Sequence, residues 1–192
     1  MKICFASHNP HKIEEIRLIL PPNFEVVGLT DLGVHEEIPE TGSTLEENSR
    51  LKAQFVWEKF KMPVFSDDSG LEVEVLDGEP GVYSARYAGL QKNAEDNMNL
   101  LLSRLRNKED RTACFKCVIT YIDASGLETQ FEGRVDGTIM YEKVGEGGFG
   151  YDPIFRPKGH TTTFAEMTDH AKNEISHRAR ALHQFLNFLT NG

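Results

Sequence analysis

A strand, a polar loop and a helix follow one another within residues 2–20, which restricts the chain to folds that combine sheet and helix. Ile3 and Phe5 alternate as in a strand. The helix that follows has its apolar residues on one face: Ile13, Ile16 and Leu20. Such a connection directs free backbone N–H groups and the positive end of the helix dipole at one spot, which suits an anion such as phosphate. The alternative is an ordinary polar connection, and the chain has no GxxxxGK[ST] Walker loop.

Three further helix patterns follow. Ser43 and Thr44 each precede a Glu by three residues, a capping-box pattern that predicts a helix through about Phe60. Asn93 is predicted to cap a helix with inward residues Met98, Leu101, Leu102 and Leu105. The last helix is predicted over about 171–189, with one apolar face: Ile175, Ala179, Leu182, Leu186 and Leu189.

Strand patterns lie between these helices. A strand over 62–66 is predicted to end at a turn over 67–70, and alternation predicts a further strand over 71–75, wet on one face. Residues 112–123 and 128–135 flank a short turn and predict an antiparallel hairpin. Helices interleaved with long strands predict a mixed-sheet α/β or α+β protein, without internal repeats or linkers.

The 192-residue chain can bury a full core, and we expect one domain over 1–192. It has no apolar signal core and no apolar run near the ~20 residues of a membrane span, so we expect a cytoplasmic protein with no membrane partner. The net charge of −9 argues against a partner that is a nucleic acid polymer. A small anionic substrate stays compatible, because local cations and a divalent metal can hold a phosphate in an acidic protein.

Two of the three cysteines, Cys114 and Cys117, have CxxC spacing. They lie in the predicted strand 112–123, where positions i and i+3 point to opposite faces and cannot easily bind one metal. The second CxxC of a zinc site is absent from the sequence. We therefore expect buried core thiols in a reducing compartment.

Two adjacent carboxylates, Asp67 and Asp68, stand with Ser69 and Gly70 at a predicted strand end, the usual place for functional groups in an α/β sheet. Buried carboxylates need a compensating cation, and Mg²⁺ is commonly held by one or two carboxylates with substrate phosphate oxygens. Glu40 is a candidate second ligand. The alternatives are a turn whose side chains cap backbone N–H groups and, at position 40, a solvated loop acid.

Three other segments carry candidate binding residues. Arg86, near glycines, can clamp a phosphate or pair with a surface carboxylate. Phe149, flanked by glycines, can stack on a flat ligand or pack as a core aromatic. Arg178 and the backbone near His177, which follow Lys172, can donate to O6 of a 6-oxopurine and repel the 6-amino group of adenine. The alternative for this last segment is a solvated polar face.

Taken together, these motifs resemble those of the inosine triphosphate pyrophosphatase family, enzymes that hydrolyse non-canonical purine nucleoside triphosphates. The matching segments follow the family's order nearly from end to end, and their joint occurrence is specific although each is weak alone. They are SHNPHK (7–12), ETG (40–42), Lys52, FSDDSGL (65–71), GVYSARYAG (81–89), GGFGYDPIF (147–155), FAEM (164–167), Lys172 and SHRARAL (176–182).

The resemblance implies an α/β fold with a long central mixed β-sheet, flanking helices and two lobes around a cleft, usually as a homodimer. The implied reaction is NTP + H₂O → NMP + pyrophosphate, with Mg²⁺ as cofactor and ITP, dITP or XTP as the small-molecule substrate. Such an enzyme cleanses the nucleotide pool.

The resemblance also implies roles for single residues. The triphosphate would be held by Ser7, His8, Asn9, Pro10, His11, Lys12, Lys52 and Ser69. Glu40 and Asp68 would bind the metal, and Asp68 would also accept the proton of the attacking water. The base pocket would be lined by Phe149, which stacks, and by Gly150, Tyr151 and Asp152. The base would be read by Lys172, His177 and Arg178.

Two rival interpretations remain at this point. Maf-like nucleotide pyrophosphatases share the general architecture, but their opening loop runs serine-proline-arginine-arginine, unlike residues 7–12 here. A non-catalytic nucleotide-binding or sensor protein could dispense with Glu40 and the carboxylate pair Asp67–Asp68, whose presence favours an enzyme. Physics does not separate Asp67 from Asp68 as the base, because adjacent carboxylates titrate as a coupled pair. The sequence shows no element that would exclude GTP.

Overall fold

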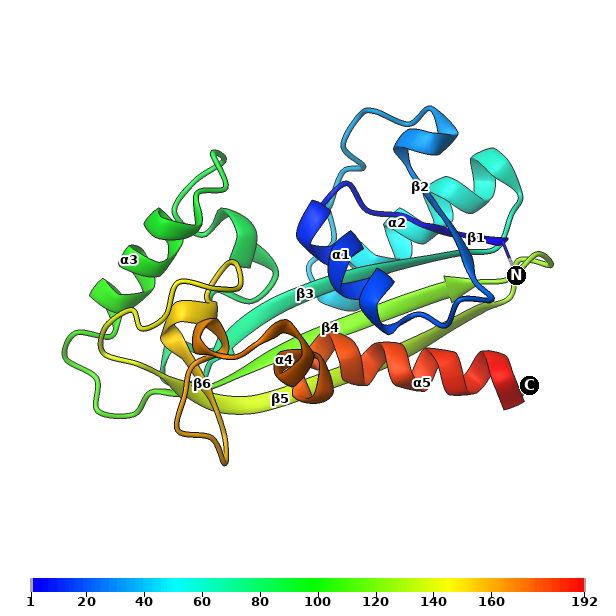
Figure 1. The fold of residues 1–192 in the computed structure, drawn as a ribbon. Helices are drawn as coiled ribbons and strands as arrows, with labels where there is room; N and C mark the ends of the chain where they lie inside the picture. Colours follow the sequence, from blue (N-terminus) through cyan, green and yellow to red (C-terminus); the bar gives the residue numbers. More distant parts are fainter. Residues whose placement is uncertain (1, 192) are drawn as a thin grey trace. The chain divides into compact units, whose positions relative to one another are not determined.

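The computed structural model describes residues 2–191, which form a six-stranded sheet flanked by helices (Figure 1). The strand order in the sheet is β2-β1-β3-β4-β5-β6. The strands are β1 (Lys2–Phe5), β2 (Glu25–Gly28), β3 (Val64–Val73), β4 (Thr112–Ile122), β5 (Glu128–Ile139) and β6 (Phe155–Pro157). The α-helices are α1 (Pro10–Ile19), α2 (Leu45–Phe60), α3 (Ala94–Arg104), α4 (Asp169–Ile175) and α5 (His177–Asn191).

The sheet is mixed, as the sequence predicts. Strand β1 runs parallel to both β2 and β3, whereas β5 and β6 are antiparallel. Strands β4 and β5 are neighbours joined by the short connection Asp123–Leu127, and parallel neighbours would need a long crossover. The predicted hairpin is therefore confirmed, with β5 continuing to Ile139, and the α/β fold class is confirmed with it.

The described chain divides into two compact units. The first contains the residues up to Asp68, Cys117–Gly133 and the residues from Arg178 onward, and the second contains Ser69–Lys116 and Arg134–His177. Strands β3, β4 and β5 each pass from one unit into the other along the chain. The single domain expected from the sequence stays a prediction.

In the first unit, alternate strand residues face opposite layers. Phe5 and Phe65 pack in a cluster with Ile16 of α1 and Phe185 of α5, whereas the adjacent residues Cys4 and Val64 pack with Ala53 and Val56 of α2. Successive side chains of a strand point to opposite faces, so α1 and α5 cover one face and α2 covers the other. In Figure 1, α5 runs beside β4 and β5, on the face that α1 also covers.

The second unit has a core of its own. Leu71 and Val73 of β3 pack with Met98, Leu101 and Leu105 of the α3 segment. The same cluster takes in further apolar residues from β4, β5, β6 and the loops after β5: Ala113, Phe115, Val135, Ile139, Tyr151, Ile154, Phe155 and Phe164. Asn93 caps α3 by accepting from the N–H of Asp96, as its sequence position predicts.

Two predicted boundaries are wrong. The turn predicted over 67–70 is the middle of β3, which runs without a break from Val64 to Val73. The single C-terminal helix is two helices, because Ser176 adopts extended backbone (ψ 155°) between α4 and α5. Ser favours such boundary positions, since its side chain competes for local backbone groups, but the apolar periodicity of the segment hides the break.

Two other predictions are confirmed. Helix α2 ends at Phe60 and begins after Thr44, whose hydroxyl accepts from the N–H of Glu47. The thiols of Cys4, Cys114 and Cys117 are free and buried, as expected for core residues. Within residues 2–191, no helix combines the length and the apolar character that crossing a membrane requires.

Candidate active site

The loop between β1 and α1 places its polar residues at the start of a helix. Asn9 is the N-cap of α1, and its Oδ1 accepts from the N–H groups of His11 and Lys12 at 3.0 and 3.3 Å. Pro10 fills the first helical position, where its missing N–H costs nothing. His8 contacts the carbonyl oxygen of Val34 through Nε2 at 2.9 Å. These contacts hold the loop in place. Asn9 accepts from two of the N–H groups that could otherwise donate to a phosphate.

A buried cluster of charges surrounds Asp67. Its Oδ2 lies 3.0 Å from Lys12 Nζ and 3.1 Å from Arg178 Nε. The guanidinium of Arg178 also pairs with Glu15, which follows Lys12 on α1. Asp67 and Arg178 are 0% and 1% exposed, so water screens these charges little. Arg178 thus has two carboxylate partners in the first unit, in addition to its predicted role in binding the purine base.

Opposite effects act on the pKa values in this cluster. Burial disfavours the ionised form of Asp67, but Lys12 and Arg178 outweigh it and hold the pKa of the carboxyl well below its usual value. Burial likewise opposes the charge of Arg178, yet Asp67 and Glu15 keep the guanidinium pKa above its usual value. The lowered pKa and the two cations at Oδ2 make Asp67 a poor proton acceptor.

Asp68 has a different neighbourhood. Lys52 Nζ, on α2, lies 2.7 Å from Glu40 Oε1 and 3.6 Å from Asp68 Oδ1. Burial of Asp68 raises the pKa of its carboxyl above the usual value, although Lys52 and Lys12 act in the other direction. Burial lowers the pKa of Lys52, but Asp68 and Glu40 outweigh that effect and raise it. One lysine thus stands between two carboxylates from distant segments.

Hydrogen bonds fix α2 against the strand that carries Asp68. The hydroxyl groups of Ser49 and Ser66 lie 3.2 Å apart, and Ser49 Oγ also accepts from the N–H of Thr120 at 3.0 Å. Ser49 and Ser66 are fully buried. Because Ser66 and Asp68 share a strand face, this contact sets the distance between Lys52 and Asp68.

Glu40 and Asp68 suit a magnesium ion. Both offer hard carboxylate oxygens, and both reach the same ammonium group, which shows that this place accommodates a cation between them. Mg²⁺ is usually held by one or two carboxylates with phosphate oxygens and water. Within residues 2–191, no group of three or more His, Cys, Asp or Glu side chains is arranged for a metal.

A second group of candidate residues lies in the second unit around Asp152. Its Oδ2 accepts from Lys172 Nζ at 2.7 Å and from the N–H of Phe149 at 2.8 Å. Lys172 Nζ also lies 4.6 Å from the centre of the Phe149 ring. A Cβ on Gly148 would sit 2.3 Å from Asp152 Oδ2, so this position requires glycine. Asp152 therefore organises both the ring and the cation.

The neighbours of that group are fixed as well. The His177 ring stacks on Phe115, with centroids 4.7 Å apart and planes 11° apart. The Tyr151 hydroxyl donates to the carbonyl of Ser84 at 2.8 Å. Gly150, between the two aromatic residues of the predicted pocket, takes a positive φ of 65°. The structure thus brings Phe149, Asp152 and Lys172 into contact, as the resemblance implies for a base pocket.

Two predicted residues have less definite surroundings. Ser69 is half-buried in β3 directly after Asp68. Arg86 ends the 3₁₀ helix Gly81–Arg86, with its guanidinium 5.3 Å from the centre of the Tyr83 ring. A phosphate-binding role for these two residues stays a prediction.

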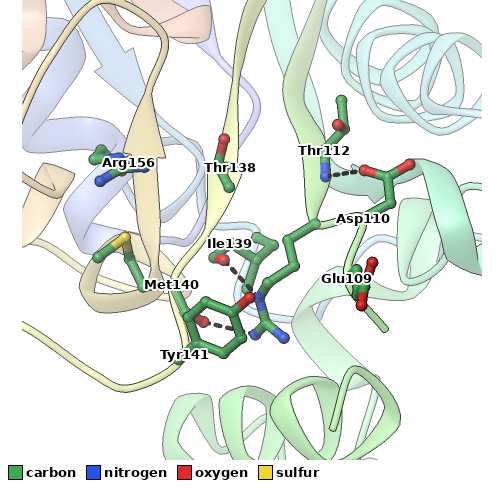
Figure 2. Close-up of a pocket in the computed structure, with 9 residues that line it drawn as sticks. Glu109, Asp110, Thr112, Thr138, Ile139, Met140, Tyr141 and Arg156 are labelled. Carbon is green, nitrogen blue, oxygen red and sulfur yellow. Dashed lines mark hydrogen bonds between the residues drawn. The ribbon is translucent and has the colours of Figure 1, made fainter. Parts of the chain in front are cut away.

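A hollow of about 350 Å³ in the second unit contains none of the predicted site residues (Figure 2). Arg111 lines this hollow, and its guanidinium donates to the carbonyls of Leu105, Ile139 and Met140. The Tyr141 ring covers the guanidinium at 4.3 Å. These bonds tie the end of α3 to the end of β5, which accounts for the buried arginine structurally.

Sequence reasoning missed several residues of the site. Glu15 lies three positions after Lys12 on α1, and this helical spacing was the available signal. The sequence offers Asp67 only as an alternative to Asp68. Phe115, under His177, looks like any aromatic strand residue, so no sequence signal distinguishes it.

The model of the Ham1 family matches residues 3–188. A Porphyromonas gingivalis protein named dITP/XTP pyrophosphatase is 53% identical over 189 residues, which cover 98% of this chain and 97% of that protein. A Bacillus subtilis protein of the same name is 49% identical over 181 residues, covering 92% and 91%. The solved structure of the Staphylococcus aureus Ham1 protein has a TM-score of 0.92 at 42% identity, covering 100% of this chain and 99% of that one.

These matches extend over nearly the whole chain, so they include both groups of site residues. They confirm the resemblance inferred from the motifs and the fold class that it implies. The chain belongs to the Ham1 family.

Proposed function

We propose that this chain is a nucleoside-triphosphate pyrophosphatase that hydrolyses ITP, dITP and XTP to the monophosphate and pyrophosphate. The relatives named dITP/XTP pyrophosphatase support the substrate class, because they are 53% and 49% identical to this chain over almost its full length. The observation that carries the proposal is the contact of Lys52 with both Glu40 and Asp68. A nucleotide-binding module has no need for two carboxylates at a phosphate site.

The proposed phosphate-binding residues include two cations of the first unit, Lys12 and Lys52. We assign the triphosphate to Lys12 and Lys52, together with the loop Ser7–His11, Ser69 and Arg86. Lys12 is held by Asp67 and Lys52 by Glu40, so both cations are oriented before substrate binds. Oriented cations stabilise charge on a transferring phosphoryl group without reorganisation.

Glu40 and Asp68 are the proposed ligands of Mg²⁺. When bound, the ion would offset negative charge on the phosphate oxygens and on the leaving pyrophosphate. Asp68 is the proposed proton acceptor for the water that attacks the α-phosphorus. Asp67 is less suited to that role, because Lys12 and Arg178 occupy its Oδ2 and keep its pKa low.

The group around Asp152 is the proposed base pocket. Phe149 would stack on the purine, a contact worth ~1–3 kcal/mol per base, while Gly150 and Tyr151 line the pocket. Lys172, His177 and Arg178 would donate to O6. A site built for that acceptor rejects adenine by ~10⁴–10⁵-fold when its donors face another donor. Glu15 and Asp67 would fix the orientation of Arg178 for this purpose.

A substrate panel tests the proposal. ITP, dITP, XTP, GTP, ATP and dUTP are each incubated with Mg²⁺, and pyrophosphate and orthophosphate are measured separately. Pyrophosphate from the 6-oxopurines ITP, dITP and XTP, and little from ATP or dUTP, supports the assignment. Nucleotide binding without any turnover would favour a sensor protein instead.

Homodimerisation, which light scattering would measure, and a cytoplasmic location are further parts of the proposal.

A further inference from the structure

Asn48 is a fully buried amide in the first turn of α2, one turn before Lys52. Its Oδ1 accepts from the N–H of Gly42 at 2.8 Å. Its Nδ2 has no hydrogen-bond partner among residues 2–191. A buried donor left unsatisfied is costly, and such groups in native structures call for an explanation. We explain the unsatisfied Nδ2 by the hydrogen bond that Oδ1 accepts from Gly42.

Gly42 belongs to the loop that carries Glu40, two residues earlier in the sequence. A Cβ on Gly42 would lie 2.6 Å from Glu47 Cβ and 2.8 Å from Asn48 Oδ1. The loop backbone therefore lies directly against the first turn of α2, and any side chain at position 42 would push it away.

Other contacts at this helix start act on later residues of the loop. The Glu47 carboxylate accepts from the N–H of Ser43, and the Thr44 hydroxyl accepts from the N–H of Glu47. Asn48 holds the loop backbone at Gly42, two residues from Glu40. Since Lys52 lies on the same helix and contacts Glu40 at 2.7 Å, α2 holds the loop backbone through Asn48 and the Glu40 carboxylate through Lys52.

We propose that Asn48 is a positioning residue that places the Glu40 carboxylate opposite Asp68. The proposal rests on the proposed function, because the metal-binding role of Glu40 belongs to it. Asn48 acts through the backbone of Gly42 and is assigned no contact with substrate or metal. The unsatisfied Nδ2 is the cost of an amide placed to hold the loop.

The clamp can be observed without catalysis. NMR hydrogen exchange of the full-length protein should show a protected Gly42 amide. In Asn48→Ala this amide should exchange about tenfold faster or more, because its acceptor is gone. Asn48→Asp keeps an acceptor oxygen and should restore the protection. Asn48→Leu, which fills a similar volume without an acceptor, replaces the alanine variant if that one does not fold.

The effect on Glu40 can be measured by titrating the substrate-free protein with Mn²⁺ as a probe for the metal site. Loss of an outer residue that orients a ligand typically weakens metal binding ~10-fold or more, and Asn48→Ala should do so. Asn93→Ala, which removes the cap of α3 in the second unit, is the control. It should lower thermal stability and leave Mn²⁺ affinity unchanged.

The outcomes separate the two ideas. An unprotected Gly42 amide in the wild type, or unchanged exchange in Asn48→Ala, overturns the clamp. Lost protection with unchanged Mn²⁺ affinity overturns the positioning of Glu40, provided that Glu40→Gln does weaken Mn²⁺ binding. If Glu40→Gln leaves Mn²⁺ binding unchanged, the metal role within the proposed function fails, and the positioning of a metal ligand by Asn48 fails with it.

Discussion

Asp67 and Asp68 are neighbours in β3, yet they have different principal partners: Asp67 Oδ2 meets Lys12 and Arg178, whereas Asp68 Oδ1 meets Lys52. Successive residues of a strand point to opposite faces of the sheet. Asp67 therefore lies on the face covered by α1 and α5, and Asp68 on the face of α2. The strand itself separates a structural carboxylate from the proposed catalytic one.

Asp67→Asn should destabilise the fold. The change removes the charge that compensates Lys12 and the buried Arg178, and breaking a buried ion pair costs ~3–5 kcal/mol. Urea unfolding followed by circular dichroism measures the difference. The matched control is Asp136→Asn, which breaks the exposed pair with Arg134 and should cost less than ~1 kcal/mol. Equal losses in the two variants would contradict a structural role for Asp67.

Asp68→Asn should abolish turnover and leave the fold intact. A positioned base contributes ~10²–10⁴-fold, so kcat for ITP should fall by at least that lower factor. The unfolding free energy should not fall, because burial already disfavours the charge of this side chain. Retained turnover with normal Mg²⁺ dependence would remove Asp68 from the mechanism.

Phe149→Ala should weaken substrate binding. Loss of a stacking ring costs ~1–3 kcal/mol, so KM for ITP should rise at least fivefold, roughly. Phe149→Tyr keeps the ring and serves as the control. Both variants retain the backbone N–H that Asp152 accepts, so the pocket itself should persist. A KM unaffected by the alanine change would exclude stacking at this position.

The three thiols should resist alkylation in the native protein. Burial raises the pKa of Cys4 to about 12 and that of Cys114 to about 11, and it also raises the pKa of Cys117. Below these values the thiols are protonated, and the thiolate is the reactive form. Mass spectrometry after iodoacetamide treatment at neutral pH should find unmodified protein, and three modifications after unfolding in urea. Rapid native labelling would show that the core is open.

Local patterns predicted most of the fold. Apolar periodicity located the helices and the hairpin, and side-chain caps located the starts of α2 and α3, because these signals act over a few residues. The run Asp67-Asp68-Ser69-Gly70 is predicted to interrupt the strand, but it lies within β3. These residues have low strand propensity, but pairing of β3 within the sheet overrides that preference.

The site was predictable in its residue types and less so in its pairings. Motifs predict Lys12, Lys52 and Asp68 as candidate site residues, whereas the partnership of Asp67 with Arg178 joins residues 111 positions apart. No local signal encodes such a contact. Asn48 was invisible for a similar reason, because its role depends on how closely the backbone of Gly42 approaches α2.

In the proposed reaction, water attacks the α-phosphorus of a 6-oxopurine nucleoside triphosphate. Hydrolysis of ITP with Mg²⁺ in ¹⁸O-labelled water, followed by mass spectrometry of the products, tests it most directly. The label is expected to enter inosine monophosphate, and pyrophosphate is expected to carry none. Label in pyrophosphate, or release of orthophosphate with inosine diphosphate, would contradict it.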